Sequence, residues 1–269
     1  MNDINHGYRI KLIKEGTGFN WLFLPGGPGL GSEYLVELCN KLSLPGSIML
    51  LDFPKDGTNP HGTLSIQYWR EGLIAILKSY DNPILVTHSF AGMLSLTMPE
   101  IENYLAGLVL MNTTTADTFF DHITAMREQH GLPDLLPAAA EYHLNPSDQT
   151  YKQFWYSYKY YCFTPEELPA GEQIMQQFAF NNAAYSEAIN HFYLSYSCSW
   201  YPTLIPTLTI ASEQDYICPP QAFIANEQFQ SKNVINKLIE KAGHFPWITQ
   251  FEAVQNCFDE FINLGQLIA

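Results

Sequence analysis

The sequence predicts an α/β protein with a mostly parallel, doubly wound sheet and an inserted helical cap. Short apolar runs alternate with segments of helical apolar spacing in residues 1–112 and again in residues 206–269. Strict alternation of this kind is typical of parallel sheets. Between residues 113 and 205 the alternation stops, and helical fragments separated by prolines take its place. We therefore expect residues 1–112 and 206–269 to form one core domain and residues 113–205 to form a cap (lid) subdomain.

The first half of the predicted core contains strands and helices in turn. The run Ile48–Leu51 is apolar throughout, as strands buried in a parallel sheet usually are. Ile66, Trp69 and Leu73 recur at helical spacing, which predicts a helix over residues 64–79. The same criteria predict strands at Tyr8–Ile13, Trp21–Leu24, Pro83–Thr87 and Leu105–Met111, and helices around residues 35–42 and 91–97.

The second half of the predicted core resumes the alternation after the cap. Strands are predicted at Thr207–Ala211 and Val234–Ile239, with a helix near Pro220–Phe229 between them. The segment Thr249–Glu252 has the pattern of a capping box, so the last helix is expected to begin there and to end before Gly265.

Composition and charge exclude several classes of protein. The 13 Lys and Arg residues against 27 Asp and Glu residues give a formal net charge of −14, which disfavours nucleic-acid binding. No apolar run approaches the ~18–20 residues of a membrane span, and the first residues lack a secretory signal pattern. The five cysteines are scattered, without C-x-x-C spacing, so neither a disulfide framework nor a metal site is expected. We expect a cytoplasmic protein without a cofactor that acts on a small molecule or short peptide.

Ser89 is the first candidate for chemistry. It lies where the predicted strand Pro83–Thr87 gives way to a helix, in the segment Thr87-His88-Ser89-Phe90-Ala91. A tight strand-to-helix turn exposes a serine hydroxyl above the sheet, where it can meet a substrate and a base. The G-x-S-x-G signature is not met, because Thr87 and Ala91 replace its glycines. Taken alone, the pattern favours an ordinary serine that ends a strand or caps a helix.

Asp215 and His244 each follow a later predicted strand. Catalytic groups in open α/β sheets gather at the carboxyl ends of the strands, so these loops can converge on Ser89. The chain order Ser, Asp, His is the order of the hydrolase triad on this architecture. The alternative is an acid from the loop after the strand Leu105–Met111, which offers Asn112 and, further on, Asp117.

The segment Pro25–Gly29 is a loop of glycines and prolines after a predicted strand. A tetrahedral intermediate needs backbone N–H donors fixed at its developing oxyanion, and glycines let the backbone approach closely. The amide of Phe90, the residue after the nucleophile, would be a second donor. The segment is not a P-loop, because it lacks G-K-[ST].

Over residues 8–264 the chain resembles the α/β-hydrolase superfamily. Pro25–Gly29 is similar to the HGGPG loop of the proline iminopeptidase branch, with Pro25 in place of its histidine. Asp52–Gly57 resembles that family's D-x-P-G-x-G loop, and Gly243–Trp247 resembles its C-terminal G-H motif.

The resemblance implies a serine hydrolase that cleaves a small amide or ester through an acyl-enzyme. Ser89 would be the nucleophile, His244 the base and Asp215 the acid. Gly27 and Phe90 would supply the oxyanion donors, and the cap would lie over the site.

The substrate is left open by the sequence. The cap segment carries 10 acidic residues against 3 basic ones and holds 19 of the 38 aromatic residues, which suits a cationic group such as a free α-amine. Trp155, Tyr158, Glu166 and Glu167 are the candidate substrate-binding residues, although these carboxylates could equally form a solvated outer face. The resemblance to the proline iminopeptidase branch tips the choice toward an aminopeptidase of that type. The alternatives are a carboxylesterase acting on neutral esters, a cofactor-free lyase or oxygenase, and a binding protein without turnover. The segment His88-Ser89-Phe90 is closer to that of esterases and of hydroxynitrile-lyase-like members than to that of iminopeptidases.

Overall fold

The protein, seen in a computed structural model, is described for residues 2–117 and 119–263. Within these residues one eight-stranded sheet runs in the order β1-β2-β4-β3-β5-β6-β7-β8. The pairs β1–β2 and β2–β4 are antiparallel, and all the other pairs are parallel. The strands are β1 (Asn2–Asn5), β2 (Tyr8–Lys14), β3 (Asn20–Leu24), β4 (Ser47–Asp52), β5 (Pro83–His88), β6 (Gly107–Met111), β7 (Thr207–Ser212) and β8 (Val234–Ile239).

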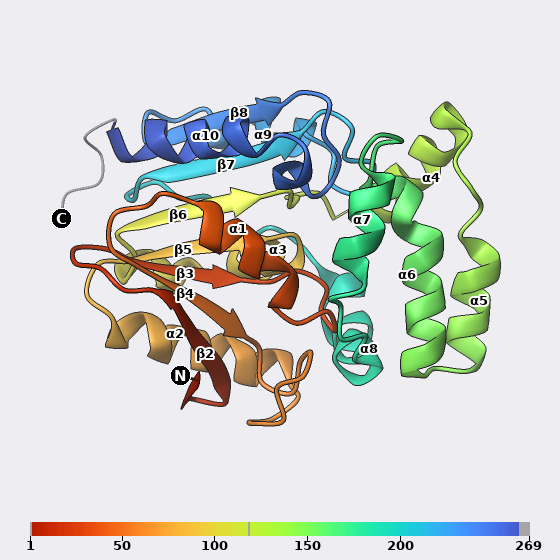
Figure 1. Ribbon diagram of the computed structural model, residues 1–269, viewed down its shortest axis with the longest axis horizontal. Helices are drawn as coiled ribbons and strands as arrows, with labels where there is room; N and C mark the ends of the chain where they lie inside the picture. The colour runs from red at the N-terminus through yellow and green to blue at the C-terminus, as the bar shows by residue number, and fades with distance from the viewer. Residues whose placement is uncertain (1, 118, 264–269) are drawn as a thin grey trace.

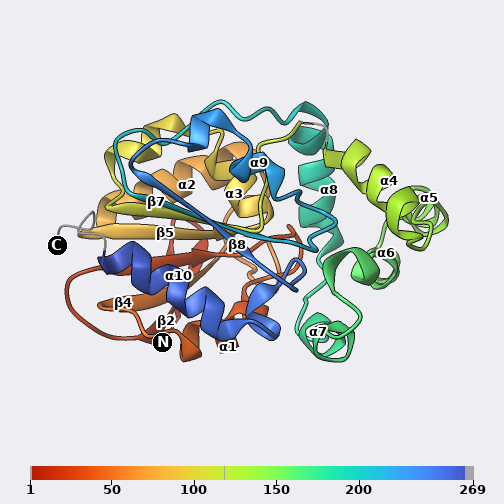
Figure 2. The same ribbon diagram turned by 90° about the horizontal axis from the view of Figure 1, so that it is seen from above.

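Helices cover both faces of the sheet (Figure 2). One face carries α2 (Ile66–Ser79), α3 (Phe90–Ser95) and α9 (Gln221–Ile224), and the other carries α1 (Val36–Lys41) and α10 (Phe251–Asn263). Every residue of β5, β6 and β7 is buried, as the continuous apolar runs predicted. The predicted mostly parallel, doubly wound sheet is therefore confirmed.

Two predictions at the ends of the core were incomplete or wrong. Strand β1 was missed because its sequence, Asn-Asp-Ile-Asn, is polar and forms only an edge pair with β2. The capping box at Thr249 was wrong: α10 begins at Phe251, and the Thr249 hydroxyl donates to Glu167 Oε1 instead. The predicted end of this helix before Gly265 falls at the edge of the described residues, which stop at 263.

Residues 113–205, the segment predicted to be a cap and called the cap below, carry five helices in their described part. They are α4 (Phe119–His130), α5 (Leu136–Leu144), α6 (Asp148–Cys162), α7 (Leu168–Met175) and α8 (Asn182–His191). Helix α6 begins at a capping box between Ser147 and Thr150. Figure 1 shows these helices beside the carboxyl ends of the parallel strands, which is where the candidate loops lie.

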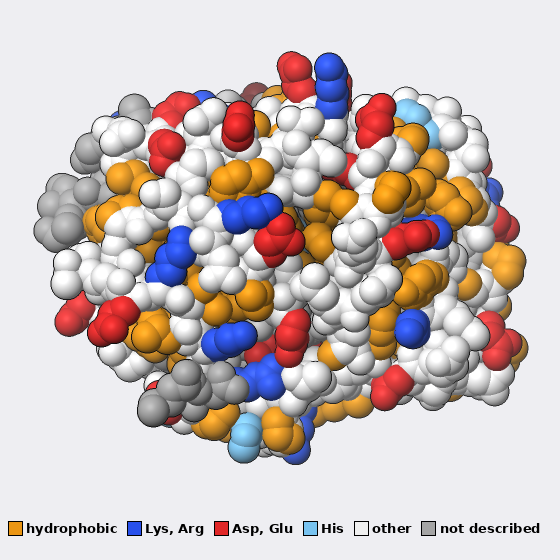
Figure 3. All heavy atoms as spheres, viewed as in Figure 1, with side chains coloured by type: hydrophobic (Ala, Val, Ile, Leu, Met, Phe, Trp, Pro, Cys, Tyr) orange, Lys and Arg blue, Asp and Glu red, His pale blue; other side chains and the backbone are white. Residues whose placement is uncertain are grey.

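Short 3-10 helices complete the described structure: η1 (Glu33–Leu35), η2 (Pro99–Asn103), η3 (Tyr193–Ser195), η4 (Glu227–Phe229) and η5 (Pro246–Ile248). Among all described helices, none combines the length and the apolar character needed to cross a bilayer. On the face shown in Figure 3, Lys and Arg side chains lie among Asp and Glu side chains, and apolar side chains surface over the cap helices.

Candidate active site

Ser89 occupies a strained turn between β5 and α3. Its φ and ψ angles are 54° and −121°, and a non-glycine residue with positive φ is uncommon. The close approach of neighbouring chains depends on two glycines. A Cβ on Gly26 would lie 2.7 Å from the Cβ of Ser89, and one on Gly92 would lie 2.5 Å from Thr113. The glycine that this turn needs is therefore Gly92 rather than residue 91, which explains how it forms without the G-x-S-x-G signature.

Asp215 and His244 form a buried pair on two adjacent loops. His244 Nδ1 lies 2.8 Å from Asp215 Oδ2, and both side chains are at most 2% exposed. The two oxygens of Asp215 also accept hydrogen bonds from the amides of Ile217 and Cys218 and from Asn112 Nδ2, at 2.9–3.0 Å. Because a carboxylate can only accept hydrogen bonds, His244 Nδ1 is the donor in its contact with Asp215.

Asn112 donates a hydrogen bond to Asp215, a role that the sequence did not predict. It follows β6 at the position where the alternative acid was sought, and its Nδ2 reaches Ser212 Oγ at 2.9 Å as well as Asp215 Oδ2 at 3.0 Å. Asp117, the alternative acid, is exposed. Asp215 is therefore the carboxylate that the structure brings to His244.

Gly27 and Phe90 are the two residues predicted to donate their amides to an oxyanion. Gly27 lines the same cavity as Ser89. In the described part of the chain, neither the Gly27 nor the Phe90 amide has a hydrogen-bond acceptor. Asp56 stabilises the Pro25–Gly29 loop, because its Oδ1 accepts a hydrogen bond from the Gly29 amide at 2.6 Å. Burial and then the charge of Asp52 raise the pKa of Asp56 to about 7.

His88 links the loop of Gly26 to the loop of His244 without facing the cavity. The Gly26 amide donates to the Tyr34 hydroxyl at 2.7 Å, and that hydroxyl lies 2.8 Å from His88 Nδ1. His88 Nε2 donates to the His244 carbonyl at 3.0 Å. Burial, followed by the neighbouring His244, lowers the pKa of His88 well below its usual value, so the ring is neutral and Nδ1 accepts a hydrogen bond from the Tyr34 hydroxyl.

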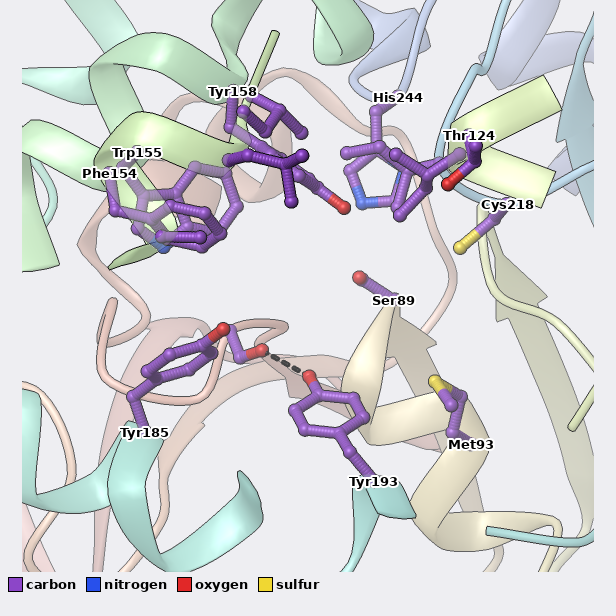
Figure 4. Close-up of a pocket in the computed structure, with 16 residues that line it drawn as sticks. Ser89, Met93, Thr124, Phe154, Trp155, Tyr158, Tyr185, Tyr193, Cys218 and His244 are labelled. Atoms are coloured by element: carbon purple, nitrogen blue, oxygen red, sulfur yellow. Dashed lines mark hydrogen bonds between the residues drawn. The ribbon is translucent and has the colours of Figure 1, made fainter. Parts of the chain in front are cut away.

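A cavity of about 280 Å³ lies between the core and the cap, above Ser89. This volume is near the lower end of the range for small-molecule sites, about 300–1,000 Å³. Figure 4 shows the Ser89 hydroxyl and the His244 imidazole facing each other across it, with Tyr185 and Tyr193 opposite. Its described lining consists of Gly27, Ser89, Met93, Ile123, Thr124, Leu135, Leu136, Ala139, Phe154, Trp155, Tyr158, Tyr185, Tyr193, Ile217, Cys218 and His244.

The structure brings two of the predicted substrate-binding residues to this cavity and leaves two outside. Trp155 and Tyr158 line it, and burial raises the pKa of Tyr158 well above its usual value, so its hydroxyl stays protonated. Glu166 is exposed to solvent. Glu167 is buried, and its carboxylate accepts hydrogen bonds from Thr164, Gly243 and Thr249 instead. No Asp, Glu, Lys or Arg side chain is present among the described lining residues, so neither Glu166 nor Glu167 supplies the expected partner for a cationic amine there.

Asp215, Cys218 and His244 bring three possible metal donors within 4.8 Å of one another. Both oxygens of Asp215 already accept hydrogen bonds from these two neighbours. Burial, then the charge of Asp215, raises the pKa of the Cys218 thiol well above its usual value, so it is not a thiolate. The hydrogen-bonded pair of Asp215 and His244 therefore explains the grouping without a metal.

A sheet of this order, with a serine at the strand-to-helix turn and a histidine–carboxylate pair beside it, is the arrangement typical of α/β hydrolases. Residues 21–255 match the model of the Alpha/beta hydrolase family, and the chain belongs to that family. No curated protein is significantly similar to the chain in sequence.

Solved structures share the fold at low sequence identity. An esterase from Thermogutta terrifontis is 16% identical, with a TM-score of 0.71 over 99% of each chain. A proline iminopeptidase-related protein from Thermus thermophilus is 18% identical, with a TM-score of 0.74 over 97% of this chain and 94% of that one. An epoxide hydrolase from Bacillus megaterium is 17% identical, with a TM-score of 0.63 over 98% and 100%. These likenesses confirm the fold alone, and at such identities they do not select among the three activities.

Proposed function

We propose that this protein is a carboxylesterase that cleaves small, neutral, apolar esters through an acyl-enzyme on Ser89. The observation that carries the proposal is the cavity itself, in which Ser89 and His244 face each other and no described lining residue is charged. A free α-amine would lose its hydration there without gaining a carboxylate, whereas an apolar acyl group would gain by leaving water.

The proposed reaction follows from the roles that these residues can take. His244 Nε2 accepts the Ser89 proton as the hydroxyl attacks the ester carbonyl, and Asp215 stabilises the imidazolium that results. The free amides of Gly27 and Phe90 are suited to stabilise the oxyanion. His244 then returns the proton to the departing alcohol, and a water molecule hydrolyses the acyl-enzyme by the same steps.

Epoxide hydrolysis and aminopeptidase activity fit this site less well than ester cleavage does. Attack of a serine hydroxyl on an epoxide would leave an ether on the enzyme, which has no carbonyl through which water could release it. An aminopeptidase needs a partner for the substrate amine, and the cap carboxylates Glu172 and Glu187 bind Lys159 and the Ile66 amide respectively.

The test compares p-nitrophenyl esters with free and N-acetylated aminoacyl-naphthylamides, using wild type and Ser89→Ala. We expect ester cleavage with a burst of p-nitrophenol, and labelling by a fluorophosphonate that Ser89→Ala abolishes. Faster cleavage of free than of acetylated naphthylamides would restore the aminopeptidase. Labelling without cleavage of any ester or naphthylamide favours a lyase or oxygenase, and the absence of both labelling and cleavage favours a binding protein.

A further inference from the structure

Glu167 is the most deeply buried acidic residue of the cap, and it does not line the cavity. It lies in the turn between α6 and α7 and is 0% exposed. Burying a carboxylate is costly unless donors surround it. A buried carboxylate that does not face the substrate therefore needs another explanation.

The donors around Glu167 come from both sides of His244. Oε2 accepts from the Gly243 amide at 3.0 Å and from the Thr164 amide at 2.9 Å. Oε1 accepts from the Thr249 hydroxyl at 3.0 Å. One carboxylate of the cap thus binds the residue before His244 and a residue five positions after it.

A second contact from the same cap turn holds His244 itself. The His244 amide donates to the Cys162 carbonyl at 2.7 Å. The His88 ring donates to the His244 carbonyl at 3.0 Å from the other side. The backbone amide and carbonyl of His244 are therefore both held by residues from other parts of the chain. The Glu167 carboxylate accepts two further hydrogen bonds, from Gly243 and Thr249 in the same loop.

We propose that Glu167 is a positioning residue: it fixes the Gly243–Thr249 segment so that the His244 imidazole meets Asp215 on one side and Ser89 on the other. The inference rests on the proposed role of His244 as the base. Misplacing a reacting group by about 1 Å can lower the rate about 100-fold, so such a contact affects turnover without touching the substrate.

What this role requires of residue 167 is reach rather than charge. In Glu167→Gln the amide oxygen can accept from the Gly243 and Thr164 amides, while the NH₂ group donates to the Thr249 hydroxyl. In Glu167→Asp the charge remains, but the carboxylate is one methylene too short. A residue that bound a cationic substrate would show the opposite order, because Asp keeps the charge and Gln loses it.

The experiment measures kcat and KM of Glu167→Gln, Glu167→Asp and Glu167→Ala with the best p-nitrophenyl ester. We expect Gln to lose no more than about 5-fold in kcat, whereas Asp and Ala lose roughly 10–100-fold with little change in KM. The same substitutions at Glu128, an exposed cap residue, are the controls and should change neither constant.

A second readout does not depend on turnover. The Nδ1 proton of His244, which is bonded to Asp215, should give a low-field resonance in the ¹⁵N-histidine-labelled protein. We expect this resonance to persist in wild type and Glu167→Gln and to broaden or vanish in Glu167→Asp and Glu167→Ala. This outcome is measurable even if no ester is cleaved, so failure of the proposed function is distinguishable from failure of this inference.

Three results would overturn the proposal. One is a lower Tm in the Asp and Ala variants with kcat and the resonance unchanged, which indicates a purely structural role. Another is a greater loss in Gln than in Asp. If neither shortened variant folds, Thr249→Val removes a single donor, and an unchanged kcat and resonance in that variant would also overturn it.

Discussion

At the scale of single residues, the chemistry of this site depends on how Ser89 is held. Its positive φ costs of the order of 1–3 kcal/mol, and such strain persists only where the surroundings enforce it. Here the Ser89 amide donates to the Met111 carbonyl at 3.0 Å, and Gly26 and Gly92 allow the close packing. The strained turn is therefore a property of the core rather than of the local sequence.

We expect Ser89→Ala to lower kcat for an ester by roughly 1,000-fold or more while Tm changes little, because only the hydroxyl is removed. His244→Ala should cost nearly as much, and the double variant little more, since the two residues act as one unit. Initial rates and thermal melts of the three variants check this. Wild-type kcat in Ser89→Ala, or losses that multiply in the double variant, would contradict it.

Asp215→Asn is expected to lower kcat roughly 1,000- to 10,000-fold, because an amide in place of the carboxylate favours the wrong tautomer of His244. Asn112 would still donate toward the same position, so the fold should survive. The control is Asp117→Asn, whose side chain is exposed and which should retain normal rates. The reverse pattern of losses would assign the acid to Asp117.

The order Ser89, Asp215, His244 could be predicted from the sequence because each residue follows its own strand. The contacts of Asn112 could not, since its partner Asp215 lies 103 positions away and an asparagine after a strand has no distinctive pattern. The fate of Glu166 and Glu167 was also unpredictable. Adjacent residues in a turn differ in burial only once the helices on both sides have packed.

At the scale of elements, the cap is attached to the core unevenly. Hydroxyls of Tyr151 and Tyr193 donate to the carbonyls of Pro28 and Gly27, both at 2.6 Å. By contrast, no residue of α5 is buried, and its contacts are mainly with α6. The sequence predicted helical fragments in this segment. It could not predict which of them would contact the Pro25–Gly29 loop, because that depends on tertiary contacts.

Ala139 on α5 lines the cavity, whereas Ala140 beside it is exposed. We expect Ala139→Trp to fill part of the cavity and to lower kcat/KM for an octanoate ester about 10-fold more than for an acetate ester. Ala140→Trp is the matched control and should leave the ratio unchanged. Equal effects of the two substitutions, measured over a series of p-nitrophenyl esters, would show that α5 does not bound the substrate.

At the scale of the whole molecule, an excess of negative charge is combined with buried carboxyls beneath the loop of Gly26 and Gly27. Asp52 is paired with Arg9 at 2.7 Å, and Glu33 lies 3.1 Å from the same guanidinium. Asp56 has no such cation, and its Oδ2 is buried without a hydrogen-bond partner in the described residues. Ionising Asp56 therefore adds a third negative charge to this region with only one Arg to balance it.

This arrangement makes stability depend on pH in a definite direction. The pKa of Asp56 is raised from 3.8 to about 7 by burial and by Asp52, so between these values the folded chain holds a proton that the unfolded chain has lost. The contribution of Asp56 to stability is thus fully present below about pH 4, is lost as the pH rises through about 7 and is constant above. A difference of about 3 pKa units corresponds to about 4 kcal/mol.

Asp56→Asn should remove this dependence on pH, because the amide does not ionise. Its oxygen can still accept hydrogen bonds from the Gly29 and Gly57 amides, which in the wild-type protein lie 2.6 Å from Asp56 Oδ1. Any cost of the new NH₂ group is the same at every pH. We expect Tm of the variant minus Tm of wild type to rise on the order of 10 °C between pH 4.5 and pH 8. Asp81→Asn, at an exposed carboxyl, is the control and should show no such trend. A difference for Asp56→Asn that stays constant with pH would mean that Asp56 is already ionised in the folded protein at pH 4.5.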